Sequence, residues 1–100
     1  MALNKAQIKQ LRTLGMQLNP LIMIGKNDIT DTLVKQADET IEKREIIKCA
    51  VQDGSGLTAK EAGAQLAEQL HAELVQVIGN RFVLYRETSR DDVKKIRLVR

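Results

Sequence analysis

The sequence has few aromatic side chains: among 100 residues there are one phenylalanine, one tyrosine and no tryptophan. A surface that binds nucleic acid through base stacking needs several exposed rings. Any nucleic-acid binding by this chain must therefore depend on charge more than on stacking.

Catalytic and metal-binding side chains are also scarce, because His71 is the only histidine and Cys49 the only cysteine. Two such residues cannot form the clustered ligand set of a zinc site, and nothing pairs His71 with a nucleophile and an orienting acid. We interpret His71 as a surface residue near a helix end and Cys49 as a small buried hydrophobe. The sequence predicts a protein that is not an enzyme and that uses no cofactor or metal.

A single cysteine excludes an internal disulfide, which suits a reducing compartment. The first 20 residues lack the apolar segment of a signal peptide. The longest apolar run, Leu21 to Ile24, is too short to span a bilayer. We therefore expect a cytoplasmic protein.

Positive charge slightly exceeds negative charge, with 16 Lys and Arg against 13 Asp and Glu. The first 30 residues contain a single acid, Asp28, whereas residues 31–45 are rich in acids. The last 20 residues carry seven basic side chains against three acids. This distribution is typical of a one-sided surface for a polyanion, but an ordinary solvated surface explains the counts equally well.

Hydrophobic periodicity predicts three helices, which cover residues 4–18, 31–44 and about 59–72. Each follows a residue that can cap it: Asn4, Thr30 and Thr58, the last within a capping box. Two glycines lie within these segments. We expect Gly15 to loosen or end the first helix, and Gly63 to mark a close approach of the third helix to the sheet.

Four strands are predicted between and after the helices. The first, Leu21 to Ile24, is a continuous apolar run of the kind that is buried on both faces. The others are Glu45 to Gln52, Leu74 to Ile78 and Arg81 to Arg86, with Gly79-Asn80 as a type II′ turn before the last. The order α-β-α-β-α-β-β predicts a mixed α/β fold, a four-stranded mixed sheet packed with helices. Residues 1–86 would form a single domain, and 87–100 a polar, basic tail with at most a short strand or helix.

Two basic features come from the first half of the chain. Lys5, Lys9 and Arg12 are spaced to share one helix face. The turn Gly25-Lys26-Asn27-Asp28 joins the first strand to the second helix, where Gly25 admits a ligand to the backbone, free amides favour an anion and Lys26 adds positive charge. If the first helix packs beside this turn, the two form one surface for RNA phosphates. The alternative is a purely structural turn, in which Asp28 or Thr30 only caps the helix.

The last hairpin offers further candidates. Arg81 flanks its turn and is expected to be exposed, and strand alternation places Tyr85 on the Arg81 face and Arg86 on the other. Tyr85 could stack on a base, although a single tyrosine in a strand is more often a partly buried core residue. The predicted RNA-binding residues are Lys5, Lys9, Arg12, Gly25, Lys26, Asn27, Asp28, Arg81, Tyr85 and Arg86.

Several segments resemble the CRM domain (chloroplast RNA splicing and ribosome maturation) in its stand-alone bacterial YhbY-type form. They are Pro20 to Asn27, the Ile29-Thr30 helix start, Glu45 to Lys48 and the closing string V-I-G-x-x-F-V-L-Y-R from Val77 to Arg86. The resemblance runs from about Leu3 to Arg86. It implies a fold like the C-terminal domain of bacterial translation initiation factor three. It also implies RNA as partner, which for stand-alone bacterial members is the precursor of the large ribosomal subunit and for plant members group II introns.

The same resemblance places the family's GxxG loop, similar in role to that of KH domains, on Gly25 to Asp28. Asp28 stands where the family has the second glycine. We expect its carboxylate to turn back and cap the helix rather than to face the RNA.

The leading hypothesis is a monomeric ribosome-assembly factor that binds structured ribosomal RNA through its phosphates. The alternative is a protein-interaction module that docks on a ribosomal protein or an assembly GTPase and touches RNA only incidentally, so that its binding is insensitive to salt. A small RNA-modifying activity is a third hypothesis, which the missing acid–base groups disfavour.

Overall fold

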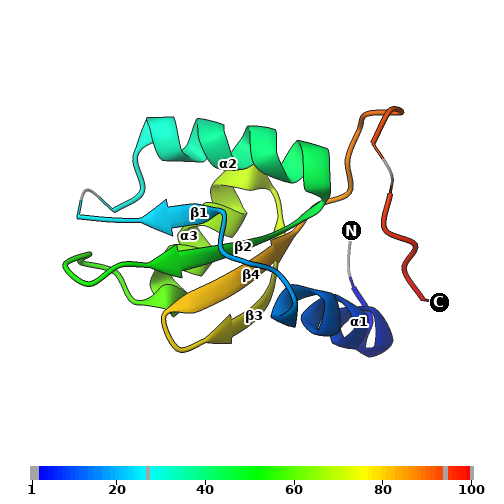
Figure 1. Ribbon diagram of the computed structural model, residues 1–100, viewed down its shortest axis with the longest axis horizontal. Coiled ribbons are helices and arrows are strands. Elements are labelled where there is room, and N and C mark those ends of the chain that lie inside the picture. Colours follow the sequence, from blue (N-terminus) through cyan, green and yellow to red (C-terminus); the bar gives the residue numbers. More distant parts are fainter. Residues whose placement is uncertain (1–2, 27, 94, 100) are drawn as a thin grey trace.

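The computed structural model describes residues 3–26, 28–93 and 95–99. Three helices and four strands occur in the predicted order, so the expected fold class is confirmed (Figure 1). No helix in these ranges is long and apolar enough to cross a membrane. The elements are α1 (Lys5–Met16), β1 (Ile22–Ile24), α2 (Asp31–Arg44), β2 (Ile46–Val51), α3 (Ala59–Leu70), β3 (Glu73–Ile78) and β4 (Arg81–Tyr85).

The strands form one mixed sheet in the order β1-β2-β4-β3. β1 pairs with β2 in parallel, whereas β4 is antiparallel to both β2 and β3. The turn between β3 and β4 begins at Gly79, whose φ of 58° is a conformation that glycine adopts without steric cost. The β3–β4 register shifts between Leu74 and Gln76, which marks a bulge in the edge strand β3.

One face of the sheet is covered by α2 and α3 and holds the larger core. Ile22 and Ile24 of β1, Ile47 and Cys49 of β2, and Phe82 of β4 are buried there. The predicted role of Gly63 is confirmed, because a Cβ at this position would lie 2.9 Å from Leu74 Cδ1 and 3.2 Å from Phe82 Cγ. The missing side chain lets α3 approach the sheet.

The other face carries α1 and the tail, around a smaller core of Leu11, Ile46, Val75, Val83 and Tyr85. The expectation that Gly15 loosens or ends the first helix is met, because α1 ends at Met16 and the amides of Gln17 and Leu18 donate to carbonyls three residues back. Gly15 is also buried, and a Cβ there would lie 2.9 Å from Val83 Cγ2, so the missing side chain lets α1 pack against β4.

The prediction that the first strand is buried on both faces is also wrong. Ile22 and Ile24 are buried, but Met23 is 48% exposed, as is 43% of the preceding Leu21. β1 lies at the edge of the sheet, and α1 packs on β2, β3 and β4 instead of on β1. The part of the second sheet face that includes Met23 is consequently left uncovered.

The tail forms no helix or strand within residues 86–93 and 95–99, but it is anchored to α2 and α1. The buried Glu45 carboxylate accepts hydrogen bonds from the backbone N–H groups of Thr88, at 2.7 Å, and Ile96. Glu42 accepts further hydrogen bonds from the backbone and hydroxyl of Ser89. The Gln10 side chain donates to the Arg97 carbonyl and accepts from the Val99 amide.

Candidate nucleic-acid interface

The turn between β1 and α2 is closed by a hydrogen bond from the Asp28 amide to the Gly25 carbonyl, at 3.0 Å. Asp28 has a φ of 56°, in the left-handed region that glycine adopts freely. The glycine that the resemblance to the GxxG loop implies at this position would adopt this φ without strain. Asn27, which was predicted to contact RNA, lies outside the described residues.

The expectation that Asp28 caps α2 is wrong. Thr30 is the cap, and its hydroxyl accepts from the Leu33 amide at 3.1 Å. The Asp28 carboxylate instead accepts from the Ser55 hydroxyl at 2.7 Å and from the Gly56 amide at 2.9 Å. Asp28 therefore links its turn to the loop between β2 and α3. The α2 amide that it could have capped, that of Leu33, already donates to Thr30, whereas the Ser55 hydroxyl and the Gly56 amide are available as donors.

Lys26 is exposed at the tip of this turn. Gly25 is half-buried, and a Cβ there would meet only the end of the Gln52 side chain, at 3.1 Å. The backbone of the turn is thus open to a ligand on one side, with a single mobile cation beside it.

Lys5, Lys9 and Arg12 are all exposed on α1, as their spacing predicts. The expectation that α1 packs beside the β1–α2 turn is not met, since the two lie toward opposite ends of the molecule (Figure 1). Arg12 also has a structural contact: its Nε donates to the Val75 carbonyl in β3, at 3.3 Å. The basic helix face and the turn are therefore two separate regions.

Two hairpin candidates cannot serve as predicted. Tyr85 is only 3% exposed, so its ring cannot stack on a base, and burial together with the charges of Glu45 and Glu87 raises its pKa to about 12. The Arg86 guanidinium is held by Asp38 at 2.7 Å and by Glu42 at 3.0 Å, which neutralise its charge. Arg81 is exposed, as expected.

Sequence reasoning missed two cations beside β1. Lys48 is half-buried on β2, and Arg44 is exposed at the end of α2. Both line a groove with Leu18, Asn19 and Leu21. The sequence could have indicated Lys48, because it is the single polar residue in the strand segment IIKCAV. A charged side chain in an otherwise apolar strand predicts that one sheet face is open to solvent at that position.

The ion pairs among the described residues lie at the tail end of the molecule. They join Arg86 to Asp38 and Glu42, Arg90 to Asp92, and Lys95 to Glu87. The positive charge of the tail is thus partly neutralised by tail acids. The cations of α1 and of the β1 side have no such acid partner within residues 3–26, 28–93 and 95–99: Lys5, Lys9, Arg12, Lys26, Arg44, Lys48 and Arg81.

Reactive groups are placed unfavourably for catalysis. Cys49 is fully buried, and burial raises its pKa to about 12, which keeps the thiol protonated. His71 ends α3 in the left-handed conformation, with a φ of 55°, and is exposed. In the part of the chain that the structure describes, no group of three or more His, Cys, Asp or Glu is arranged to hold a metal ion.

Known proteins resemble this chain over most of its length. Residues 3–86 match the model of the CRS1 / YhbY (CRM) domain. The chain is 33% identical over 85 residues to the Probable RNA-binding protein YqeI of Bacillus subtilis. The match covers 85% of this chain and 88% of that protein. It is 30% identical to an RNA-binding protein of Haemophilus influenzae, with 92% and 93% of the two chains covered.

A solution structure of a Staphylococcus aureus protein, for which RNA binding has been put forward, has the same fold. It superimposes with a TM-score of 0.73 at 36% identity, and the match covers 95% of this chain and 100% of the other. The family match, the sequence relatives and the shared fold together show that this chain belongs to the CRS1 / YhbY (CRM) domain family.

Proposed function

We propose that the protein binds RNA through phosphate contacts and catalyses no reaction. The observation that carries the proposal is the set of exposed cations without acid partners on α1 and around β1, beside a turn whose backbone is accessible at Gly25. Unpaired Lys and Arg attract a polyanion and release its counterions. The naming of relatives as RNA-binding proteins supports the same function.

The two basic regions set a requirement on the RNA. They lie toward opposite ends of a molecule whose longest extent is 40 Å. A single RNA that reaches both regions must therefore span most of that length.

We further propose that this RNA belongs to precursors of the large ribosomal subunit, and that the protein acts as a monomeric assembly factor. Few side chains are available to read base edges, so recognition would come from RNA shape and from neighbouring ribosomal proteins. Crosslinking in cells followed by sequencing of the bound RNA tests this assignment. Crosslinks confined to large-subunit precursors would support it, and scattered crosslinks would indicate a general RNA binder.

The salt dependence of binding tests the phosphate contacts directly. Lys26→Gln and Lys9→Gln should each flatten the slope of log K against log salt by about 0.7–0.9, the contribution of one neutralised phosphate. These sites are better suited than Arg12, whose Nε also bonds Val75. Lys95→Gln is the matched control, because Lys95 already faces Glu87 at 3.6 Å.

Unchanged slopes in both test variants would refute the proposed surface. Binding that is insensitive to salt in the unmodified protein would instead favour the protein-interaction module as the function.

A further inference from the structure

The uncovered part of the second sheet face has a regular composition. One row of residues crosses the four strands by register: Met23 beside Ala50, Ala50 beside Arg81, and Arg81 beside Ile78. In the next row Lys48 lies beside Val83, and Val83 beside Gln76. We refer to Met16, Met23, Lys48, Gln76, Ile78 and Arg81 together as the open half-face.

Apolar side chains are concentrated on this surface. Met16 is 68% exposed, Met23 48% and Ile78 57%, and Leu21, directly before β1, is 43% exposed. These are four of the six large apolar residues that are exposed in the described chain. Single exposed apolar residues are ordinary, but a cluster marks a binding surface.

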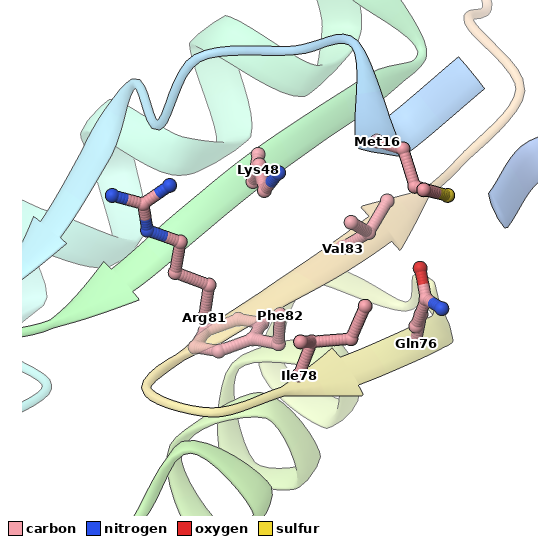
Figure 2. A pocket seen from close by; sticks show the side chains of 7 residues that line it. All are labelled: Met16, Lys48, Gln76, Ile78, Arg81, Phe82 and Val83. Atoms are coloured by element: carbon pink, nitrogen blue, oxygen red, sulfur yellow. The ribbon is translucent and has the colours of Figure 1, made fainter. Parts of the chain in front are cut away.

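The charges of the open half-face have one sign. Figure 2 shows the Lys48 and Arg81 side chains on the same side of the sheet as Met16 and Gln76. Arg81 extends from β4 over β2. No acid is among the described residues that line this surface, and neither cation takes part in a described ion pair. Its electrostatic complement is therefore an anionic partner.

The shape of the surface distinguishes between kinds of partner. The hollow lined by Met16, Lys48, Ile78 and Arg81 has a volume of about 20 Å³, enough for one water molecule. A protein partner usually inserts an aromatic or aliphatic anchor into a pocket, and this hollow is too small to receive one. The larger groove that Lys48 lines with Leu18, Leu21 and Arg44 is a separate feature. A flat nucleotide base needs no pocket, because it lies against a surface.

We propose that the open half-face binds a single-stranded segment of RNA. Neighbouring strands are about 4.8 Å apart, so the Met23–Ile78 row is roughly 14 Å long and can hold two or three bases. Lys48 and Arg81 bind the phosphates, and the methionine and isoleucine side chains contact base faces. A duplex hides its base faces and leaves these apolar side chains without a partner. This inference rests on the proposed RNA-binding function and adds a preference for unpaired nucleotides.

The test uses the double variant Met23→Thr/Ile78→Thr, which removes apolar surface and retains β propensity and charge. Val77→Thr is the matched control. Val77 is 38% exposed and lies in β3 next to Ile78, but it pairs with the buried Phe82 and therefore belongs to the other face of the sheet. Binding is measured by fluorescence anisotropy to a single-stranded RNA of about 10 nucleotides, within the usual site size of one domain. A blunt-ended RNA duplex without unpaired nucleotides serves as the duplex probe.

We expect the double variant to bind the single strand about tenfold more weakly, because it removes apolar surface that the bases would cover. Its affinity for the duplex, its salt slope and its unfolding temperature should match those of the unmodified protein, because apolar contacts release no counterions. Val77→Thr should change neither affinity.

Undiminished binding of the single strand by the double variant would overturn the inference, as would an equal loss for both probes. A double variant that keeps RNA affinity but no longer associates with purified large-subunit proteins would assign the surface to a protein partner. If the unmodified protein binds neither RNA probe, the proposed function itself fails. If Lys26→Gln alone weakens binding, that function stands and only the open half-face is wrongly assigned.

Discussion

Replacing Glu45 by glutamine would disturb the junction between α2 and the tail. The Glu45 side chain is fully buried and accepts hydrogen bonds from the backbone amides of Thr88 and Ile96. A glutamine has one acceptor oxygen, and its NH₂ group would then face a backbone donor that has no other partner. The backbone φ of 65° at this position is equally unfavourable for both residues, so that strain cancels in the comparison.

The expected cost follows from the hydrogen bonds that change. A hydrogen bond to a charged group contributes about 1.5–3 kcal/mol, and a buried unsatisfied amide costs about 1–3 kcal/mol. One bond loses its charge and the other is lost, so Glu45→Gln should lower the free energy of unfolding by roughly 2–4 kcal/mol. For a domain of this size, a loss of about 2 kcal/mol lowers the unfolding temperature by roughly 8–16 °C.

Thermal unfolding followed by circular dichroism measures this loss, and trypsin digestion reports release of the tail through cleavage after Arg90 and Lys95. Glu68→Gln is the control, because Glu68 is exposed on α3 and should unfold at the unmodified temperature. If Glu45→Gln unfolded at that temperature with the tail still protected, the buried carboxylate could not be what anchors the tail.

Three further outcomes are expected. Hydrogen bonds from Ser89, Thr88 and Arg86 lower the pKa of Glu42 from 4.5 to about 2. The ionised Glu42 therefore stabilises the fold above pH 4.5, and this stabilisation is lost as the pH falls toward 2. In an acid titration, a Glu42→Gln variant should lose less stability over that range than the unmodified protein. Gly63→Ala should lower the unfolding temperature despite the better helix propensity of alanine, because the new Cβ would lie 2.9 Å from Leu74; an unfolding temperature at or above that of the unmodified protein would contradict the close packing of α3. Asp28→Gly should tighten RNA binding at low salt, because it removes a negative charge next to Lys26 and relieves the positive φ, with the difference disappearing at high salt; equal affinity at low salt would show that the carboxylate is too far from the RNA to matter.

Local signals in the sequence predicted the element order well, because capping is a short-range property. Asn4, Thr30 and Thr58 each cap the helix that follows them, and Gly79 supplies the positive φ of the hairpin. Contacts between distant segments had no such signal. Arg86 meets carboxylates 44 and 48 residues away along the chain, and nothing near it in the sequence indicates that its charge is neutralised.

The candidate site was predicted only in part for the same reason. Lys26 and Arg81 are exposed as expected, but where α1 lies depends on packing across the sheet. The run Leu21 to Ile24 is apolar at every position, so it carries no alternation from which an exposed face could be read. Met23 is exposed because α1 packs on β2, β3 and β4 and leaves β1 uncovered. The same placement leaves Lys48 beside this open surface, and neither result can be read from the sequence.

The two edge strands allow such a surface to remain in solution. A sheet with an open apolar face is at risk of pairing edge to edge with another copy of itself. β1 has only three residues and follows a proline, which limits the ladder that a second chain could add. At the other edge, β3 carries a bulge, and Arg12 already occupies the Val75 carbonyl. Arg12 therefore protects a backbone acceptor against self-association, so that its replacement would promote aggregation as well as remove a positive charge.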